Sequence, residues 1–409
     1  MRDSDYTTAL SKCVRCGSCK ALCPAYEEET TEAMSARGKL TLLWGLSSGL
    51  LSPSPELCDR VFGCLLCGRC VGSCPLEIDI KELMYHGRRS LRDMDKGRRI
   101  LRFLTKLCIK RPGSAFKMLS RMQHILFPYF LKKGILPFRP ELPENHLKDR
   151  FRLFTVLKKQ GRVAVFSGCM INFLYPYLGE ALVNTLRRLN YEVILPPGEV
   201  CCGVPLRAVG LEEEAVKLAK KNINTFKRLN VEAVLSLCPT CTYAIKVEYP
   251  KLIGEGIERA EDISTFLIDK IESIYPQRSS FTQNIIFHDP CHLKYGLGIE
   301  REPRVILKNL GLNPVKINDD RCCGFAGLFC FSFKETSRGL LNRCVEDYTK
   351  AGGEIIITSC PGCMMQLSRE IKDKPVIHLI EAVEEAMLQP VSLKEGLFAE
   401  SPIQTTPPV

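Results

Sequence analysis

Residues 231–241 read VEAVLSLCPTC, and residues 354–363 read EIIITSCPGC. Each stretch is a short apolar run rich in β-branched residues that leads into a Cys-Pro-x-Cys pair, which predicts a buried strand with two thiols at its carboxyl end. Helical sequence lies between such runs, as in residues 212–229 and 335–351. Strands that alternate with helices predict α/β units around mostly parallel sheets.

The same arrangement occurs twice along the chain. Apolar runs at residues 162–166 and 284–287 precede two lone cysteines, Cys169 and Cys291, and a Cys-Cys-Gly triplet follows each of them. The two five-cysteine sets are Cys169, Cys201, Cys202, Cys238 and Cys241, and Cys291, Cys322, Cys323, Cys360 and Cys363. Functional groups gather at the carboxyl ends of strands in open α/β sheets. We therefore predict two homologous α/β cysteine-rich domains, over residues 161–280 and 281–390.

The N-terminal cysteines follow a different rhythm. Residues 13–24 read CVRCGSCKALCP, and residues 64–75 read CLLCGRCVGSCP. Both match C-x2-C-x2-C-x3-C-P, in which three close thiolates hold one 4Fe-4S cube and the fourth reaches a second cube. By that rule one cubane is bound by Cys13, Cys16, Cys19 and Cys74, and the other by Cys64, Cys67, Cys70 and Cys23. Zinc takes four ligands as two C-x2-C pairs and fits eight thiols poorly. We predict a mostly helical domain over residues 1–90, with a helical stretch at residues 37–46.

Each five-cysteine set holds more thiolates than a cubane or a zinc ion accepts. Adjacent cysteines on an extended backbone point in different directions, so they suit a larger or distorted cluster in which one thiolate bridges two irons. The glycine that follows, Gly203 or Gly324, is expected to relieve crowding between backbone and sulfide. A dithiol redox pair or simple packing is the alternative for such cysteines, and their repetition in register disfavours both. Four further cysteines are expected to be small buried hydrophobes: Cys58, Cys108, Cys330 and Cys344.

Composition and charge narrow the class of protein. The 409 residues include 22 cysteines and show neither an apolar N-terminal leader nor a charge-free apolar run long enough to span a membrane, so we expect a cytoplasmic protein with reduced thiols. Net charge is +11, but residues 86–162 hold 21 Lys+Arg against five Asp+Glu. We predict a basic helical and irregular linker over residues 91–160 and a flexible tail over residues 391–409. The basic segment is either a solvated helical face or a surface that docks a partner subunit or the inner face of the cell membrane. It lacks a nucleic-acid recognition motif, so no nucleic-acid partner is expected.

No catalytic residue is assigned, although His288 and His292 flank Cys291 and are candidate proton donors to a leaving thiolate. Ordinary hydrogen bonding at a strand end is the interpretation that we favour for both. Neither a G-x-G-x-x-G opening a βαβ unit nor a G-x-x-x-x-G-K-[ST] loop occurs, so no flavin or nicotinamide is expected in this chain. Hydride transfer is a two-electron step that needs such a cofactor, so any hydride transfer would take place in a separate flavoprotein subunit.

Two ferredoxin motifs followed by two Cys-Cys-Gly motifs resemble the iron–sulfur subunit of glycolate oxidase (glycolate dehydrogenase). They are also similar to the wider family that contains the heterodisulfide reductase catalytic subunit and the iron–sulfur subunits of lactate and anaerobic glycerol-3-phosphate dehydrogenases. The resemblance covers roughly residues 8–385 and includes Ala36-Arg37-Gly38-Lys39, which looks like the Arg-Gly stretch of the glycolate oxidase branch.

The resemblance implies one noncubane 4Fe-4S cluster in each five-cysteine set. It implies an electron-transfer subunit, inactive alone, that carries electrons from a flavoprotein to a quinone or other acceptor within a glycolate- or lactate-type dehydrogenase complex. Glycolate oxidase subunits often have an incomplete second motif, whereas the set that begins at Cys291 is complete. This departure keeps a thiol/disulfide oxidoreductase, similar to heterodisulfide reductase, as the alternative.

Overall fold

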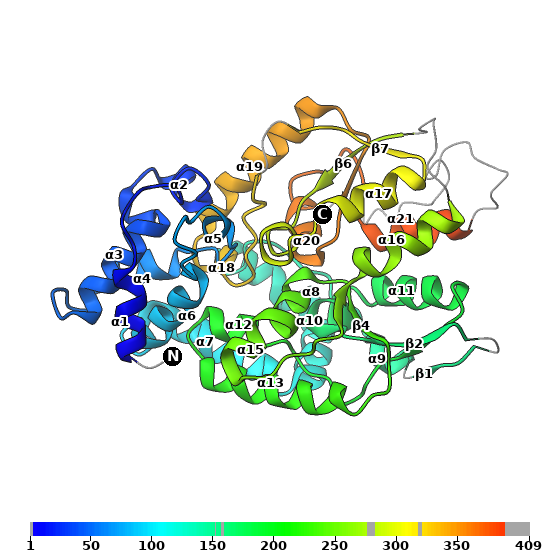
Figure 1. Cartoon of the computed structure of the whole chain (residues 1–409), viewed down its shortest axis with the longest axis horizontal. Coiled ribbons are helices and arrows are strands. Elements are labelled where there is room, and N and C mark those ends of the chain that lie inside the picture. Colours follow the sequence, from blue (N-terminus) through cyan, green and yellow to red (C-terminus); the bar gives the residue numbers. More distant parts are fainter. Residues whose placement is uncertain (1–2, 152, 157–158, 276–282, 318–320, 389–409) are drawn as a thin grey trace.

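The computed structural model describes residues 3–151, 153–156, 159–275, 283–317 and 321–388. A helical N-terminal part lies beside two α/β parts, each built around a small, mostly parallel sheet (Figure 1). Within the described ranges, no helix combines the length and apolar character needed to cross a bilayer. The tail predicted at residues 391–409 lies outside the described residues.

The N-terminal part is helical, as predicted, and the stretch expected at residues 37–46 is helix α3, Ala36–Ser47. Serine side chains cap two of its helices, because the Ser35 hydroxyl accepts from Gly38 N and the Ser54 hydroxyl accepts from Leu57 N. Apolar faces of these helices, including Leu40 and Met84, form one buried cluster. The helices are α1 (Asp3–Ser11), α2 (Pro24–Glu29), α3, α4 (Pro55–Phe62), α5 (Arg69–Gly72) and α6 (Ile80–Leu91).

The basic segment is more helical than the sequence indicated. Helix α7 covers Arg99–Lys110, and helix α8 covers Pro112–Lys132 without ending at Pro128. Pro112 occupies the first turn of α8, where a backbone N–H has no helical partner to lose, and Pro128 removes one donor near the end of a long helix. A proline at either place therefore does not prevent the helix. Helix α9 (Leu147–Arg150) follows.

Two sheets carry the cysteine-rich part. The strands at residues 161–165, 233–236, 283–288 and 355–358 lie within two residues of the four predicted runs, and the other strands were not predicted. The first sheet has the order β1-β3-β2-β4-β5 and the second the order β7-β6-β8-β9; β1 runs antiparallel to β3, and the other pairs are parallel. The strands are β1 (Leu153–Phe154), β2 (Gly161–Val165), β3 (Tyr191–Ile194), β4 (Ala233–Ser236), β5 (Ala260–Asp262), β6 (Gln283–His288), β7 (Leu312–Pro314), β8 (Ile355–Thr358) and β9 (Val376–His378). Val163 pairs with Ala233 and Ile285 with Ile355, so the repeat keeps its register.

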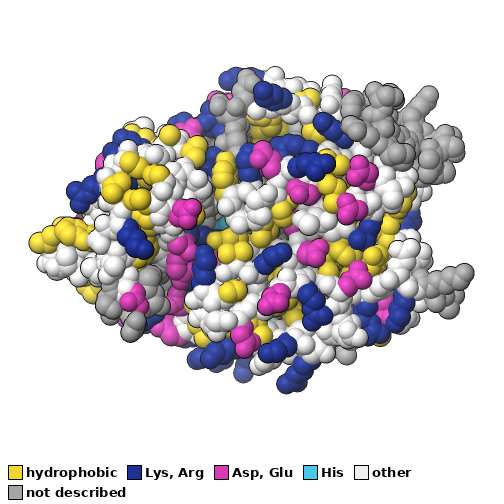
Figure 2. Space-filling model, in the orientation of Figure 1, with side chains coloured by type: hydrophobic (Ala, Val, Ile, Leu, Met, Phe, Trp, Pro, Cys, Tyr) yellow, Lys and Arg dark blue, Asp and Glu magenta, His cyan; other side chains and the backbone are white. Residues whose placement is uncertain are grey.

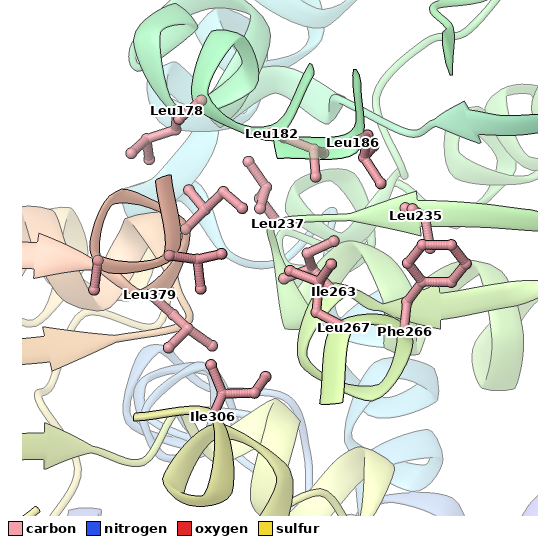
Figure 3. Close-up of a cluster of buried hydrophobic side chains, with 14 of the residues drawn as sticks. Leu178, Leu182, Leu186, Leu235, Leu237, Ile263, Phe266, Leu267, Ile306 and Leu379 are labelled. Atoms are coloured by element: carbon pink, nitrogen blue, oxygen red, sulfur yellow. The ribbon is translucent and has the colours of Figure 1, made fainter. Parts of the chain in front are cut away.

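Two pairs of helices form the interface between the two α/β parts. Helix α11 (Pro176–Arg188) packs on α21 (Leu379–Leu388), and α16 (Ile263–Ile274) packs on α17 (Arg301–Asn309). Because α11 corresponds to α17 and α16 to α21 in the repeat, the two parts pair about a pseudo-two-fold axis. Figure 3 shows the shared core, where leucines of α11, isoleucine and leucine of α16, and side chains of α17 and α21 converge.

The remaining helices position the cysteines and contact the N-terminal part. Helix α2 packs on α19, and α6 packs on α12, so the N-terminal part touches both α/β parts (Figure 1). Charged side chains of both signs are interspersed over the face seen in Figure 2. These helices are α10 (Gly168–Phe173), α12 (Val204–Ala208), α13 (Glu212–Lys227), α14 (Pro239–Tyr243), α15 (Tyr249–Ile253), α18 (Phe329–Ser332), α19 (Lys334–Ala351) and α20 (Pro361–Leu367), with π-helical turns at Ala244–Glu248 and His292–Gly296.

Candidate functional site

The eight N-terminal cysteines line two separate cavities, four in each. The outer cavity is lined by Cys13, Cys16, Cys19 and Cys74, and the inner cavity by Cys23, Cys64, Cys67 and Cys70. The two motif loops have the same backbone conformation. Arg15 and Leu66 have φ of 57° and 56°, and Gly17 and Gly68 have φ of 92° and 81°. The structure thus brings together the same four thiols that the spacing assigned to each cubane.

The cavities differ in exposure and in the charges around them. Cys16 is exposed, and a hydrogen bond with Ser18 lowers the pKa of its thiol. In the inner cavity, burial raises the pKa of Cys23 and Cys70. A four-thiolate cluster is anionic, so this buried site needs compensating cations and hydrogen-bond donors.

Two buried cations meet that need. Lys39 lines the inner cavity, is only 1% exposed, and donates to the carbonyl oxygen of Met34. Arg88 is also buried and donates to the carbonyl oxygens of Cys64 and Phe62, and across the interface to that of Ala208 at 2.9 Å. Both cations therefore stabilise negative charge at the inner cavity, and the sequence reasoning missed Arg88.

The ten remaining cluster candidates form two rows of sulfur contacts. Within the second row, Cys323 Sγ lies 3.4 Å from Cys363 Sγ. In the first, hydrogen bonds with Cys201 and Cys241 lower the pKa of Cys202 to about 6. In order of contact, the first set is Cys169, Cys201, Cys202, Cys241 and Cys238, and the second set is Cys291, Cys322, Cys323, Cys363 and Cys360.

Local sequence explains how these thiols are presented. Cys238 and Cys360 each precede a helix that starts with proline, so free backbone amides at the helix start point to the thiol. The backbone itself requires the glycines after the Cys-Cys pairs, in addition to the expected relief of sulfide crowding, which stays a prediction. Gly203 and Gly324 have φ of 89° and 75°, and a Cβ on Gly324 would lie 2.5 Å from the Ser337 carbonyl oxygen in α19. A left-handed turn pressed against a helix requires glycine there.

Two sulfur contacts between sets were not foreseen from the sequence. Cys238 and Cys360 contact each other, and they are equivalent residues of the repeat that meet at the pseudo-two-fold axis. Cys67 of the inner cavity contacts Cys291 of the second set. The thiols therefore form a continuous series from the inner cavity through the second set to the first set.

His288 lies against the second set. Its Nδ1 hydrogen-bonds the Tyr348 hydroxyl, and ligand atoms of His288, Cys323 and Cys363 lie within 4.8 Å of one another. Burial lowers the pKa of His288, but the hydrogen bond and charge of Cys323 outweigh burial and raise it. The imidazole is placed to hydrogen-bond a thiolate or to serve as a further metal ligand.

His292 lies at the junction of all three parts. Its Nδ1 is 2.8 Å from the Thr240 hydroxyl, and its Nε2 is 3.0 Å from Lys81 Nζ and 3.1 Å from the Leu66 carbonyl oxygen. Burial and Lys81 lower its pKa to about 4, so the imidazole is neutral at pH 7. These partners match the interpretation of ordinary hydrogen bonding at the strand end.

His292 borders a buried ionic group that the sequence did not reveal. Lys81 Nζ lies 2.9 Å from Glu248 Oε1, and the Tyr85 hydroxyl donates to the same oxygen at 3.2 Å. Arg207 contacts the other Glu248 oxygen at 3.4 Å and Glu82 at 2.6 Å. Burial alone would raise the pKa of Glu248, but Lys81 and Arg207 lower it to about 2. We call Lys81, Tyr85, Arg207, Glu248 and His292 the domain-linking network.

The four cysteines left out of the clusters mostly behave as expected. Cys58, Cys330 and Cys344 are buried, whereas Cys108 is half-buried. His378 ends β9 and hydrogen-bonds the Leu237 carbonyl oxygen at 3.0 Å.

Comparison with known proteins follows this division of the chain. The cysteine-rich domain family matches residues 163–246 and 285–368, and the 4Fe-4S dicluster domain family matches residues 9–78. The chain is 26% identical to the probable glycolate oxidase iron-sulfur subunit of Bacillus subtilis, over 93% of each chain. It is also 26% identical to one of the subunits of the dihydromethanophenazine:CoB–CoM heterodisulfide reductase from Methanosarcina acetivorans, over 88% of each chain.

A solved structure supports the fold. A hypothetical protein from Helicobacter pylori superposes with a TM-score of 0.56 over 94% of this chain and 73% of its own, at 10% identity. At that identity the likeness concerns the arrangement of helices and strands.

Proposed function

We propose that this chain, which joins a 4Fe-4S dicluster domain to two cysteine-rich domains, carries electrons within a glycolate- or lactate-type 2-hydroxy-acid dehydrogenase complex. Its relatives include iron–sulfur subunits of oxidoreductase complexes, which supports an electron-transfer role and a partner catalytic subunit. The proposed donor is an FAD-containing subunit, and the acceptor is a quinone or another carrier. We place the complex in the cytoplasm, at the inner face of the cell membrane.

The donor sets fit the implied clusters. The outer and inner cavities would each hold a cubane on four cysteines, with Lys39 and Arg88 balancing the charge of the inner one. Each five-cysteine set would hold a noncubane 4Fe-4S cluster. Bound clusters would supply one-electron sites. The chain's own residues shield the two five-cysteine sets and the inner cavity from water and fix the order of the sites.

The observation that carries the proposal is the continuous series of thiol contacts. The outer cavity lies nearest the surface, because Cys16 and Val14 are exposed there. From it the order is the inner cavity, then the second set through Cys67 and Cys291, then the first set through Cys360 and Cys238. We propose that the flavoprotein docks beside the outer cavity and that electrons follow this order inward.

Anaerobic purification with iron and sulfide counts tests this proposal. Four filled sites predict about 16 iron atoms and as many sulfides per chain, together with a copurifying flavoprotein. Cys67→Ser should remove about four irons, whereas the matched control Cys58→Ser, a buried thiol outside the cavities, should keep the full count. A colourless, iron-free wild-type protein would exclude the proposal.

A second candidate is a thiol/disulfide oxidoreductase, in which a noncubane cluster cleaves a disulfide in two one-electron steps. It is favoured by the complete second set and by the meeting of both sets at Cys238 and Cys360. Treating the oxidised protein with a thiol substrate should then produce a new paramagnetic signal. Without that signal, this candidate is eliminated and the electron-transfer role stands.

A further inference from the structure

The charge of the chain is concentrated in one helical segment. Residues 96–140 contain twelve Lys+Arg and neither Asp nor Glu, and the rest of the chain carries 45 basic against 46 acidic residues. Helices α7 and α8 lie within this segment and pack against each other. An excess of positive charge confined to one helix pair favours an anionic partner.

Helix α7 exposes a stripe of apolar side chains and buries a charged one. Its inward face carries Arg102, which is paired with the buried Asp95 at 2.6 Å, and the adjoining Arg98 makes an ion pair with the same carboxylate at 2.9 Å. Its outward face carries Ile100, Phe103, Leu104 and Leu107, and Ile100 and Phe103 are 74% and 65% exposed. Spacing of three, four and seven residues places these four side chains on one stripe. Such a stripe is unfavourable in water unless another apolar phase covers it.

Helix α8 presents a second apolar stripe to solvent. Met118, Met122, Ile125 and Tyr129 are all exposed, and Ile125 reaches 76%. Basic side chains border both stripes, because Lys110 and Arg121 are exposed as well. We call the eight apolar residues of α7 and α8 the docking face.

We propose that the docking face seats this chain on an anionic lipid bilayer, with both helices lying in the interface plane. Apolar side chains would enter the boundary between headgroups and acyl chains, while the bordering Lys and Arg side chains would contact anionic headgroups. Neither helix is long and apolar enough to span, so the attachment is peripheral. Residues outside the segment pair with Arg98, Arg102, Lys106 and Lys117. The exposed Lys110 and Arg121 form no ion pair among the described residues, and the segment itself holds no acidic residue, which favours an anionic lipid surface over a protein interface, where charges of both signs usually pair. This binding does not depend on filled clusters.

Vesicle flotation with the full chain, purified anaerobically, tests the docking face. The wild-type chain should float with phosphatidylcholine vesicles that contain about one third phosphatidylglycerol, and much less with phosphatidylcholine alone. Phe103→Ser combined with Leu107→Ser should lower the bound fraction at least about tenfold. Leu50→Ser combined with Leu153→Ser is the matched control, since both leucines are exposed and lie off the face.

A second pair of variants separates charge from apolar contact. Lys110→Glu with Arg121→Glu should abolish the preference for anionic vesicles, whereas Lys217→Glu with Lys220→Glu changes net charge equally on α13 and should not. This inference rests on the membrane placement in the proposed function. Equal iron content in every variant shows that the fold is intact, so a loss of vesicle binding is distinguished from a loss of the clusters. The proposal is overturned if the wild type fails to float with anionic vesicles or if the face variants bind as well as their controls. It is also overturned if Phe103→Ser with Leu107→Ser instead abolishes self-association of the chain, or if binding requires removal of residues 389–409.

Discussion

At the scale of single residues, Gly324 shows why the Cys-Cys-Gly triplet needs its glycine. Alanine there would combine a left-handed φ of 75° with a Cβ 2.5 Å from the Ser337 carbonyl oxygen. We expect Gly324→Ala to lower the free energy of unfolding by about 2–4 kcal/mol, measured by anaerobic urea denaturation. The matched control is Gly352→Ala, with φ of 72° and open space around the added Cβ, which should cost about 1 kcal/mol. Equal losses would show that the contact with α19 is unimportant.

Lys39 is a residue whose effect should be visible in a reduction potential. Its ammonium is buried beside Cys23 and Cys64, where a cation stabilises the more negative, reduced form of a cluster. Lys39→Met keeps most of the volume and should lower the midpoint potential of the inner-cavity cluster by roughly 50–100 mV. The measurement is a potentiometric titration followed by electron paramagnetic resonance. Lys217→Met, an exposed site on α13, serves as the control, and an unshifted potential in Lys39→Met would contradict the assignment.

At the scale of elements, the strands were predictable because their information is local. Buried β-branched runs such as Ile355–Thr358 are short and continuously apolar at their start, and they lie just before a cysteine. The length of α8 was not predictable by the same reasoning, because Pro128 usually ends a helix and only the complete packing shows that this helix continues. The exposed apolar stripe of α7 was also misleading, since periodicity alone indicates that the apolar face of a helix points inward.

Helix α21 carries a carboxyl group that should make its stability depend on pH. Glu381 Oε1 accepts from His378 N at 2.6 Å, and burial raises its pKa to about 7, above the ordinary value of 4.5. The unfolded chain therefore loses this proton at a lower pH than the folded chain does. The protonated group contributes its full stability below about pH 4.5, and this stability is lost as the pH rises through about 7.

Glu381→Gln removes that titration while keeping an acceptor for His378 N. Relative to wild type, the variant should gain stability progressively from pH 5 to pH 8. The gain should reach about 1–2 kcal/mol, because the Glu381 side chain is half-buried and solvent screens part of its charge. Urea unfolding at several pH values measures the difference. Glu346→Gln, the same substitution at an exposed position of α19, is the control. A pH-independent difference in Glu381→Gln would contradict the raised pKa.

At the scale of the whole molecule, motif spacing predicted which cysteines belong to each group. It did not predict which groups contact each other. The eight N-terminal thiols divide between two cavities as the spacing required, because the ferredoxin rhythm is contained in two short loops. The contacts Cys67–Cys291 and Cys238–Cys360 join residues more than 120 positions apart. They arise from the way α2 and α6 pack on the α/β parts and from the pseudo-two-fold pairing, neither of which has a local sequence signal.

The domain-linking network should determine whether the three parts behave as one unit. Glu248 is 3% exposed and neutralises Lys81 and Arg207, which come from different parts of the chain. Glu248→Gln would remove the carboxylate that pairs with buried Lys81, whereas Arg207 would keep Glu82. Because it removes one partner of a buried ion pair, we expect the substitution to lower the free energy of unfolding by about 3–5 kcal/mol. It should also increase amide hydrogen exchange in α6, because Lys81 and Tyr85 of that helix would lose their contacts with the π-helical turn at Ala244–Glu248. The control is Glu213→Gln, which removes an exposed ion pair with Arg92 and should cost less than about 1 kcal/mol. If both variants lose equally little unfolding free energy, then apolar packing holds the parts together, and the network only satisfies its own charges.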